Sequence, residues 1–445
     1  MHYKNLSKNN KFCTFPWIGT FISPSGHMNA CCMQTNFTKK TLNDISIDHT
    51  RNSTEWVQLR KDLINGIEHP SCEKCWFAER NNSGSTRTSY ALSNQFNMHD
   101  IEINKNGTLN ETNKITYWDI RSSNKCNMKC INCNPSFSSS LNTEAIDRLV
   151  SIINETESKN YDVDPGVQKI NDIFYAENTF PTSTPVNFYE QFPLGIRKNE
   201  LSKLSSIIEL DNTTKSSIID RVEKNIDNLT GFYFAGGEPL MNDIHWKILD
   251  ILIKYEKYDL PINYNTNFSL LTYKGKNILD YWKKFKYLKV GVSIDAIGKR
   301  AKYLRYGTNW KKIEKNIDIL LTEFSNIDLE ISSTVSILSL GGFKSLYDWA
   351  KNRKVRLVSS NFLEHPEWLA IVLLSDELKD KFYNELKDII SDKIEYHLYK
   401  QISTDDLYKN RSQLKKYINV LDKLRNNSIF ESCPELSKFY KGINE

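Results

Sequence analysis

The sequence has no long run of hydrophobic residues. Its apolar stretches are short, as at residues 368–374, whereas a helix that spans a bilayer needs about 20 consecutive apolar residues. The opening residues, MHYKNLSKNNKF, also lack the apolar core of a secretory signal. We therefore expect a soluble, cytoplasmic protein with no membrane partner.

An excess of one charge is missing too. The 445 residues include 59 Lys and Arg against 54 Asp and Glu, and both signs are spread along the whole chain. A nucleic-acid surface usually shows clustered basic residues, so no such partner is indicated. Hydrophobic residues make up 39% of the chain and aromatic residues 12%, which excludes a disordered protein. The length allows one large α/β domain and a smaller module.

Cysteine is almost absent after residue 133, where only Cys433 remains. In a chain without a secretory signal, clustering of the others favours metal ligation by thiolates over a disulfide framework. The clustered residues are Cys13, Cys31, Cys32, Cys72, Cys75, Cys126, Cys130 and Cys133.

Short apolar segments then alternate with segments of helical periodicity. In the helix expected at 216–229, for example, Ile219, Val222 and Ile226 mark one buried face. Six strand–helix units predict a parallel sheet in an open, partial (βα)6 barrel, with all strand C-termini at one end. The expected strands are 115–121, 231–235, 261–266, 288–294, 329–336 and 355–359. The expected helices are 141–154, 216–229, 244–255, 277–285, 310–324 and 343–351.

Two stretches depart from this alternation. Residues 155–215 are rich in Asn, Ser and Thr and are interpreted as an insertion, partly loop. After Leu374, charged amphipathic helices are expected at 376–392 and 405–425. The predicted regions are a cysteine-rich module at 1–110, the partial barrel at 111–365 and a helical C-terminal extension at 366–445.

Three cysteines follow the first expected strand with the spacing CxxxCxxC. Cys126, Cys130 and Cys133 can ligate three irons of a 4Fe-4S cluster and leave the fourth iron without a protein ligand. Such an open iron can bind S-adenosylmethionine, and its reductive cleavage releases a 5′-deoxyadenosyl radical. A zinc knot is the alternative, but structural zinc takes four ligands and no partner Cys or His follows nearby.

With this motif the sequence resembles the radical S-adenosylmethionine superfamily over residues 115–359. The resemblance includes FYFAGGEPLM, where Gly236, Gly237 and Glu238 match the family's GGE motif. It implies that the glycines let the backbone approach the ligand and that the Glu238 carboxylate accepts hydrogen bonds from the methionine ammonium group. A plain Gly-Gly turn is the alternative.

Later strand ends carry the same resemblance. The third strand ends in YNTNF, which contributes Asn265, and the fourth reads KVGVSIDAIG with an Arg further along. The resemblance implies that Ser293 contacts the ribose or methionine end and that Arg305 pairs with the carboxylate, with Asp295 a further candidate. A helix cap or a solvated charge is the alternative for Asp295 and Arg305.

The sequence departs from the family pattern at two positions. Asn132 stands where the family often has an aromatic residue before the third cysteine, and Phe268 replaces a glycine after the third strand. A backbone contact to adenine could survive at Asn132, whereas ring packing would be lost.

The amino-terminal segment resembles a SPASM or twitch auxiliary-cluster domain placed before the barrel. The resemblance includes Cys13 followed by Pro16 and Trp17, a GxxxxC element ending at Cys31, and CEKC at 72–75. It implies a second 4Fe-4S cluster, and a four-thiolate zinc ribbon is the alternative. The implied ligands are Cys13, Cys31, Cys72 and Cys75, with Cys32 able to replace Cys31.

The order of these motifs resembles twitch domain-containing radical S-adenosylmethionine proteins of phages and bacteria. The resemblance implies an enzyme that abstracts hydrogen from a peptide or protein side chain, or from a small molecule, with flavodoxin or ferredoxin as reducing partner. Modification of a nucleotide, tRNA or sugar is the alternative within enzymes. A non-catalytic iron–sulfur protein is the alternative outside them, and it would make Glu238, Ser293 and Arg305 incidental.

Overall fold

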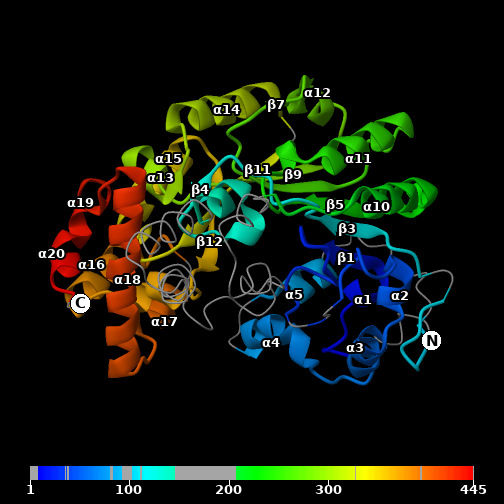
Figure 1. Ribbon diagram of the computed structural model, residues 1–445, viewed down its shortest axis with the longest axis horizontal. Coiled ribbons are helices and arrows are strands. Elements are labelled where there is room, and N and C mark those ends of the chain that lie inside the picture. Colours follow the sequence, from blue (N-terminus) through cyan, green and yellow to red (C-terminus); the bar gives the residue numbers. More distant parts are fainter. Residues whose placement is uncertain are drawn as a thin grey trace, which may run out of the picture.

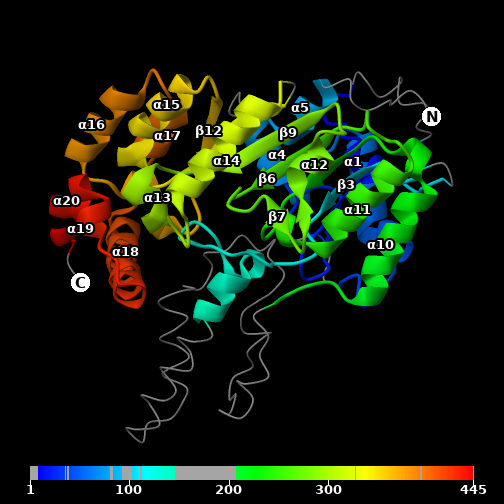
Figure 2. The ribbon, with the colours of Figure 1, turned by 90° about the horizontal axis from the view of Figure 1, so that it is seen from above.

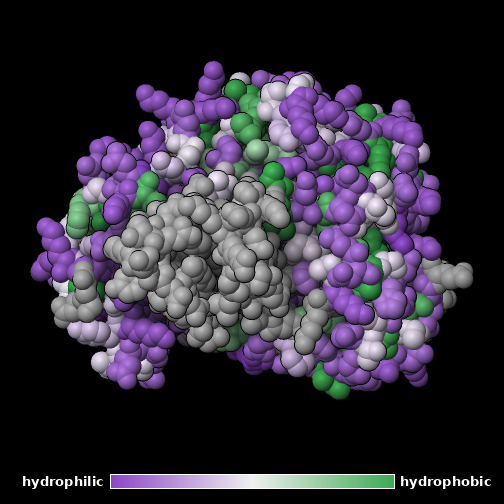
Figure 3. Space-filling view, viewed as in Figure 1, coloured by the Kyte–Doolittle hydropathy of each residue, from purple (hydrophilic) through white to green (hydrophobic). Residues whose placement is uncertain are grey.

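The structure is a computed structural model that describes residues 9–35, 37, 40–80, 84–92, 103–110, 113–145, 207–325, 327–390 and 393–443. Within these residues, none of the helices combines the length and the apolar character that crossing a membrane requires. Where residues are coloured by hydropathy in Figure 3, the surface is mostly hydrophilic, with hydrophobic residues in small areas.

One eight-stranded sheet runs through the molecule (Figure 1). Its order is β12-β11-β9-β6-β5-β3-β1-β2, and every neighbouring pair is parallel except β1 with β2. The strands are β1 (Gly19–Ile22), β2 (Met28–Asn29), β3 (Tyr117–Ile120), β5 (Gly231–Phe234), β6 (Ile262–Thr266), β9 (Leu288–Ser293), β11 (Asp328–Val335) and β12 (Arg356–Phe362). Two short antiparallel pairs stand apart from it, β4 (Lys129–Cys130) with β10 (Arg305–Tyr306) and β7 (Thr272–Tyr273) with β8 (Lys276–Asn277).

Helices cover one face of this sheet (Figure 1). The strand residues that face them, such as Phe232, Ile262 and Val290, are fully buried, and the alternate residues Tyr233 and Asn263 are only partly buried. This period of two leaves a polar inner face opposite the helices. The helices between the strands are α10 (Asn212–Lys224), α11 (Asp243–Lys254), α12 (Ile278–Trp282), α13 (Gly298–Leu304), α14 (Trp310–Glu323) and α15 (Phe343–Asn352).

Polar side chains start several of these helices. Asp211, Asn242 and Asn309 each accept a backbone N–H bond from the first turn of α10, α11 and α14, which satisfies donors that have no partner inside a helix. The apolar stripe of each helix then packs on the sheet, and Ile248 and Leu252 of α11 are completely buried. Local capping and periodicity therefore explain why the expected helices form.

The amino-terminal segment shares its core with the sheet. β1 pairs in parallel with β3, and Trp17, Trp56 and Trp118 lie fully buried in one cluster with the barrel residues. Arg60, also fully buried, donates to the backbone carbonyls of neighbouring loops, which holds the segment together. Its helices are α1 (Phe15–Ile18), α2 (Ile47–Arg51), α3 (Thr54–Ile64), α4 (Glu73–Arg80) and α5 (Thr86–Leu92).

The C-terminal helices form a second core with the far end of the sheet. Val335 of β11 and Phe362 of β12 belong to this cluster together with Ile418 of α18, and Figure 2 shows these helices gathered beside β12. Arg411 donates to two carbonyls of the preceding loop. The helices are α16 (Asp376–Leu386), α17 (Lys393–Tyr399), α18 (Thr404–Arg425), α19 (Ile429–Ser432) and α20 (Ser437–Lys441).

The structure confirms the α/β class, the parallel sheet and the helical C-terminal region. The six expected strands are present, and β12 runs past the expected end to Phe362. The expected helix at 141–154 is helical as far as residue 145, and the remainder lies outside the described residues, as does most of the insertion at 155–215. α10 begins at Asn212, inside the expected insertion. The region boundaries at 110 and 365 stay predictions.

Candidate functional site

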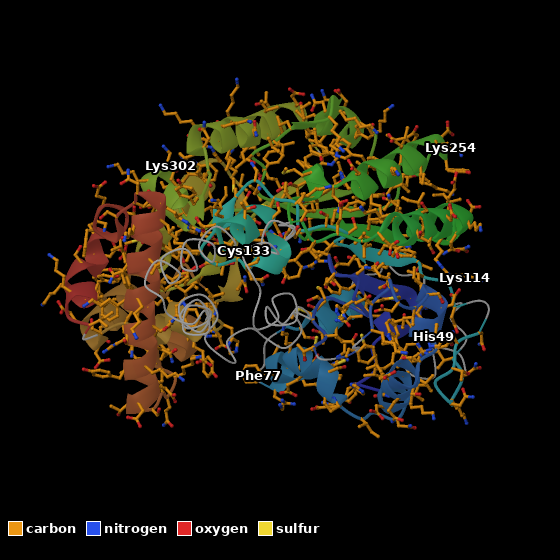
Figure 4. All side chains as sticks on the ribbon, in the orientation of Figure 1. His49, Phe77, Lys114, Cys133, Lys254 and Lys302 are labelled. Carbon is orange, nitrogen blue, oxygen red and sulfur yellow. The ribbon has the colours of Figure 1, made fainter. Side chains whose placement is uncertain are left out.

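The C-terminal ends of the parallel strands carry the predicted site residues. Because these ends meet at one edge of the sheet, side chains far apart in sequence become neighbours there. The loop with the three cysteines follows β3, and Cys133 lies on it between the sheet and the C-terminal helices (Figure 4). Gly236 to Glu238 follow β5, Asn267 follows β6, and Asp295 follows β9.

Three consecutive serines fold the cysteine loop back on itself. Ser139 Oγ accepts from the Cys126 backbone N–H at 3.2 Å, and Ser140 Oγ donates to the Cys126 carbonyl at 2.7 Å. Ser138 Oγ donates to the carbonyl of Met128 at 2.7 Å. The SSS sequence after the motif therefore fixes the loop backbone.

A short antiparallel pairing ties the loop to a distant segment. Cys130 of β4 faces Arg305 of β10, and Lys129 faces Tyr306. The Ile131 N–H donates to the Leu304 carbonyl at 2.8 Å. This pairing brings Arg305 beside the cysteines, which nothing in the local sequence indicates.

The three thiols lie close enough to interact electrostatically. Burial and the neighbouring Cys130 thiol raise the pKa of Cys133 to about 12. Burial, Cys130 and Glu238 raise the pKa of Cys126 as well. Burial also raises the pKa of Cys130, against a lowering by Arg305. Ionising all three in this buried loop requires a cation among them, because like charges in a low-dielectric site repel.

Donors already point at two of the sulfurs. Nη1 of Arg305 lies 3.7 Å from Sγ of Cys130, and Nδ2 of Asn267 lies 3.8 Å from Sγ of Cys126. N–H groups directed at cysteine sulfur are the outer interactions that tune iron–sulfur clusters. Three thiolate donors with such N–H groups fit a cluster in donor type.

Glu238 is buried at the end of β5, with 2% of its surface exposed. Oε1 accepts from Thr266 Oγ1 at 2.6 Å and from the Leu240 N–H at 3.2 Å. Oε2 accepts from the Asn267 N–H at 2.8 Å. Burial raises the pKa of Glu238 to about 7, although these hydrogen bonds lower it. The carboxyl group is thus held by three hydrogen bonds at the end of β5.

The glycines before it allow close packing against the cysteine loop. Gly236 has φ +116°, and a Cβ there would lie 2.8 Å from the Cβ of Arg121. A Cβ on Gly237 would lie 2.6 Å from the carbonyl carbon of Asn124 and would also meet the carbonyl oxygen of Lys125. The absence of side chains at these glycines therefore allows close contact with Arg121 and with the backbone of the cysteine loop.

Arg305 and Asp295 form a buried ion pair. Nε of Arg305 lies 2.9 Å from Oδ2 of Asp295, and Nη2 donates to Oδ1 at 3.0 Å. Oδ1 also accepts from the Thr334 backbone N–H at 2.9 Å. Both residues were candidates from the sequence, and in the structure they pair with each other.

Asn265 and Ser293 lie on the polar inner face. Their side chains form no hydrogen bond with the cysteines, Glu238 or Arg305. Asn265 pairs with Gly291, and its Oδ1 fills the space beside that glycine. Ser293 ends β9, opposite Ser332 of β11. Both are half-buried.

Four amino-terminal cysteines come together from separate elements. Cys13 precedes α1, Cys31 follows β2, Cys72 ends a short 3-10 helix and Cys75 lies in α4. Burial, together with Cys72 and Cys75, raises the pKa of Cys13 to about 12, and burial with its cysteine neighbours raises that of Cys31. These electrostatic effects show that the four thiols lie near one another.

A buried glutamine links the two cysteine segments. Gln34 Oε1 accepts from the Ala30 N–H at 2.7 Å, and its Nε2 donates to Ser71 Oγ at 3.0 Å. These neighbours precede Cys31 and Cys72 directly in the sequence. Gln34 thereby fixes the spacing of the two thiols.

Cys32 also raises the pKa of the neighbouring Cys31, but its own thiol has a different partner. It donates a hydrogen bond to Asp119, and burial with this carboxyl group raises its pKa to about 11. Asp119 holds Arg121 through Oδ1 and Oδ2 at 3.0 and 3.1 Å, and the guanidinium lies over the Phe21 and Tyr233 rings. This pair was not among the predicted site residues, and its signal in the sequence is two charged residues at alternate positions of an otherwise apolar strand.

No group of three or more His, Cys, Asp or Glu residues is arranged to hold a single metal ion in the part of the chain that the structure describes.

No protein-family model matches the chain, and no curated protein matches it. Solved structures similar to it include native anSMEcpe with bound AdoMet, at 14% identity and a TM-score of 0.33 over 70% of this chain. Another is Streptococcus suis SuiB bound to the precursor peptide SuiA, at 13% identity and a TM-score of 0.33 over 94% of this chain and 75% of that one. The chain spans about 62% of the anSMEcpe chain.

Proposed function

We propose that the chain is a radical S-adenosylmethionine enzyme. The observation that carries this proposal is the meeting of Cys126, Cys130 and Cys133 with Glu238 and Arg305 at one edge of a parallel sheet. The cysteines follow β3, Glu238 follows β5 and Arg305 lies in β10, so their proximity is a property of the fold rather than of one local motif.

In this proposal the three thiolates hold a 4Fe-4S cluster with one open iron. A cluster held by these thiolates would supply the electron that cleaves S-adenosylmethionine to methionine and a 5′-deoxyadenosyl radical, which could abstract hydrogen from a substrate. The N–H groups of Asn267 and Arg305 stabilise the charge on the sulfurs of Cys126 and Cys130.

Glu238 is the proposed acceptor for the ammonium group of S-adenosylmethionine. Its carboxyl group is held from both oxygens by Thr266 and by the N–H groups of Asn267 and Leu240. A cation placed beside it favours the ionised carboxylate and forms a charge-assisted hydrogen bond. Glu238 thus orients the cofactor without moving.

Arg305 is the proposed partner of the cofactor carboxylate. Asp295 and the Thr334 N–H fix its direction, so the arginine is already ordered before a ligand binds. Asn265 and Ser293 are proposed to line the cofactor site further along the inner face of the sheet.

The amino-terminal thiols of Cys13, Cys31, Cys72 and Cys75 are proposed to hold a second 4Fe-4S cluster. Their number saturates a cubane, and Arg87 lowers the pKa of both Cys13 and Cys72 against the effect of burial. Cys32 is left outside this set because its thiol bonds to Asp119. A zinc site with the same four thiolates is the alternative.

The proposed substrate is a peptide or protein side chain, and flavodoxin or ferredoxin is the proposed electron donor. The support for the substrate class is the resemblance of the amino-terminal cysteine pattern to SPASM and twitch domains. The polar inner face, with Tyr233 and Asn263, is compatible with hydrogen bonding to a peptide backbone.

The decisive experiment is anaerobic reconstitution followed by two assays. Iron and sulfide are counted, with about eight irons expected for two cubanes, and reductive cleavage of S-adenosylmethionine is measured as 5′-deoxyadenosine. Replacing Cys126, Cys130 and Cys133 by Ala should abolish cleavage and remove about four irons. Cys433→Ala is the matched control, because this thiol is buried in the C-terminal core away from both sets.

A well-loaded protein that forms no 5′-deoxyadenosine would overturn the proposal and favour a non-catalytic iron–sulfur protein. If the amino-terminal cysteines bind zinc instead of iron, the proposed radical reaction is unaffected, but the proposed second 4Fe-4S cluster is wrong.

A further inference from the structure

The C-terminal helix α18 reaches the cysteine loop through a buried ion pair. Its last residue, Arg425, donates from Nε and Nη2 to the two carboxylate oxygens of Glu144 at 3.1 and 2.7 Å. The two side chains are only 2% and 7% exposed. Glu144 lies in the helical turn at 139–145, directly after the serines that fold the loop. The pair therefore ties the end of the C-terminal region to the cysteines.

The same guanidinium packs against the strand that pairs with the loop. Arg425 lies over the ring of Tyr306, 5.2 Å from its centroid. Tyr306 faces Lys129 in the β4–β10 pairing, immediately beside the pair of Cys130 and Arg305. Lys129 Nζ in turn lies 3.6 Å from Glu144. Three charged residues and one aromatic ring therefore pack together beside Cys130: Lys129, Glu144, Arg425 and Tyr306.

The third nitrogen of the Arg425 guanidinium group differs from the two that bind Glu144. Nη1 of Arg425 is buried and has no hydrogen-bond partner among the residues that the structure describes. Asn132 lies between Cys130 and Cys133, and both polar atoms of its side chain are also buried without a hydrogen-bond partner among the described residues. Leaving a buried charged donor without a partner is costly. The guanidinium lies over Tyr306, next to the pair of Cys130 and Arg305, and its charge acts on the Cys130 thiol together with that of Arg305.

We infer that Arg425 is a positioning residue that fixes and tunes the cysteine-ligated cluster, so the C-terminal helical region is part of the site. The inference rests on the proposed function. The bidentate bond to Glu144 sets the guanidinium in place, and Nη1 has no acceptor among the residues that the structure describes. Its positive charge stabilises the reduced, more negative form of the cluster, and the negative charge of Glu144 offsets part of this effect.

The first test is a redox titration of reconstituted protein followed by electron paramagnetic resonance. The catalytic cluster is identified as the one whose signal changes when S-adenosylmethionine is added. Arg425→Gln removes a positive charge and should lower its midpoint potential, whereas Glu144→Gln removes a negative charge and should raise it. Shifts of opposite sign distinguish charge tuning from loosening of the structure, which would not follow the sign of the lost charge.

The matched control is Glu435→Gln. Glu435 binds Arg300 through both carboxylate oxygens at 2.6 and 2.7 Å, and this pair also ties the C-terminal region to the barrel. Arg300 lies on α13, so this ion pair does not involve the cysteine loop. Glu435→Gln should leave the potential of the catalytic cluster unchanged, and the amino-terminal cluster should not respond to any of the three variants.

The second test needs no cluster. In the cluster-free full chain, Arg425→Gln should accelerate amide hydrogen exchange at 129–131 by about tenfold, because the loop loses its anchor. Glu435→Gln should accelerate exchange only around 432–436.

Wild-type exchange and wild-type potential in Arg425→Gln, or an equal change in Glu435→Gln, would overturn the inference. Absence of 5′-deoxyadenosine in the wild-type protein would instead overturn the proposed function, and the exchange result would still decide whether Arg425 anchors the loop.

Discussion

Arg305 and Cys130 face each other across a two-residue antiparallel pairing, with Nη1 of the arginine 3.7 Å from the sulfur. Asp295 holds the other side of the same guanidinium. One arginine therefore connects a cysteine of the loop after β3 with the carboxylate after β9. Its planar fork suits this double role, which a single ammonium group cannot fill.

Arg305→Lys should therefore weaken S-adenosylmethionine binding. We expect a loss of roughly tenfold in affinity, about 1.4 kcal/mol, because lysine keeps the charge but loses the fork. Equilibrium dialysis of the reconstituted protein measures the dissociation constant. Arg353→Lys is the control, since that arginine forms ion pairs with Glu314 and Asp318 on the outer helices. An unchanged dissociation constant in Arg305→Lys would remove this arginine from the cofactor site.

Gly237→Ala should displace the cysteine loop. The added Cβ would collide with the backbone of Asn124 and Lys125, and overpacking of this kind costs about 1–3 kcal/mol. Denaturant unfolding should show this loss, and iron content after reconstitution should fall. Gly84→Ala is the matched control, because a Cβ there meets nothing within 4 Å. If Gly237→Ala binds iron and unfolds like the wild type, the close packing is not required.

Two adjacent cysteines should behave differently. Cys31→Ala should lose about four irons, one cubane, because its thiol lies with Cys13, Cys72 and Cys75. Cys32→Ala should keep them, since Cys32 bonds to Asp119. Iron analysis after reconstitution gives the answer, with each variant serving as the control of the other. Loss of iron in Cys32→Ala alone would exchange their roles.

Acid should weaken the contact between α17 and the loop after β12. The hydrogen bond with His397 lowers the pKa of Glu364 to about 2, and Lys400 also contributes. Because this folded-state pKa lies below the unfolded value of about 4.3, the stabilisation is present above that value and is lost as the pH falls toward 2. The midpoint of thermal unfolding should therefore be lower in Glu364→Gln than in the wild type at pH 7, and the difference should vanish near pH 2.

Glu367→Gln is the control for this pH series, because Glu367 is exposed and lies 3.9 Å from His365. A constant difference between Glu364→Gln and the wild type across the whole pH range would contradict the assignment.

Local patterns predicted much of this fold. The six strands and the helices between them follow from periodicity and capping, which depend on residues close together in sequence. The cysteine loop was singled out by its spacing and Glu238 by the resemblance of its GGE motif, and both lie at the edge where the ends of the parallel strands meet.

Contacts between distant segments could not be predicted. Arg425 and Glu144 are separated by 281 positions, and no local signal pairs a residue of the C-terminal helix with the cysteine loop. The β4–β10 pairing involves only two residues in each strand, which is too short for an alternating pattern. Asp119 and Arg121 lie within the expected strand 115–121, and the strand pattern alone does not show that two of its charged residues form an ion pair.

The addition of β1 to the edge of β3 limits how the protein can be divided. A chain that began after residue 110 would expose the unpaired N–H and C=O groups of β3, and open strand edges of this kind recruit other chains and aggregate. The shared tryptophan core would be opened at the same time. The two groups of cysteines thus belong to one cooperative unit, and each is expected to need the other's segment in order to fold.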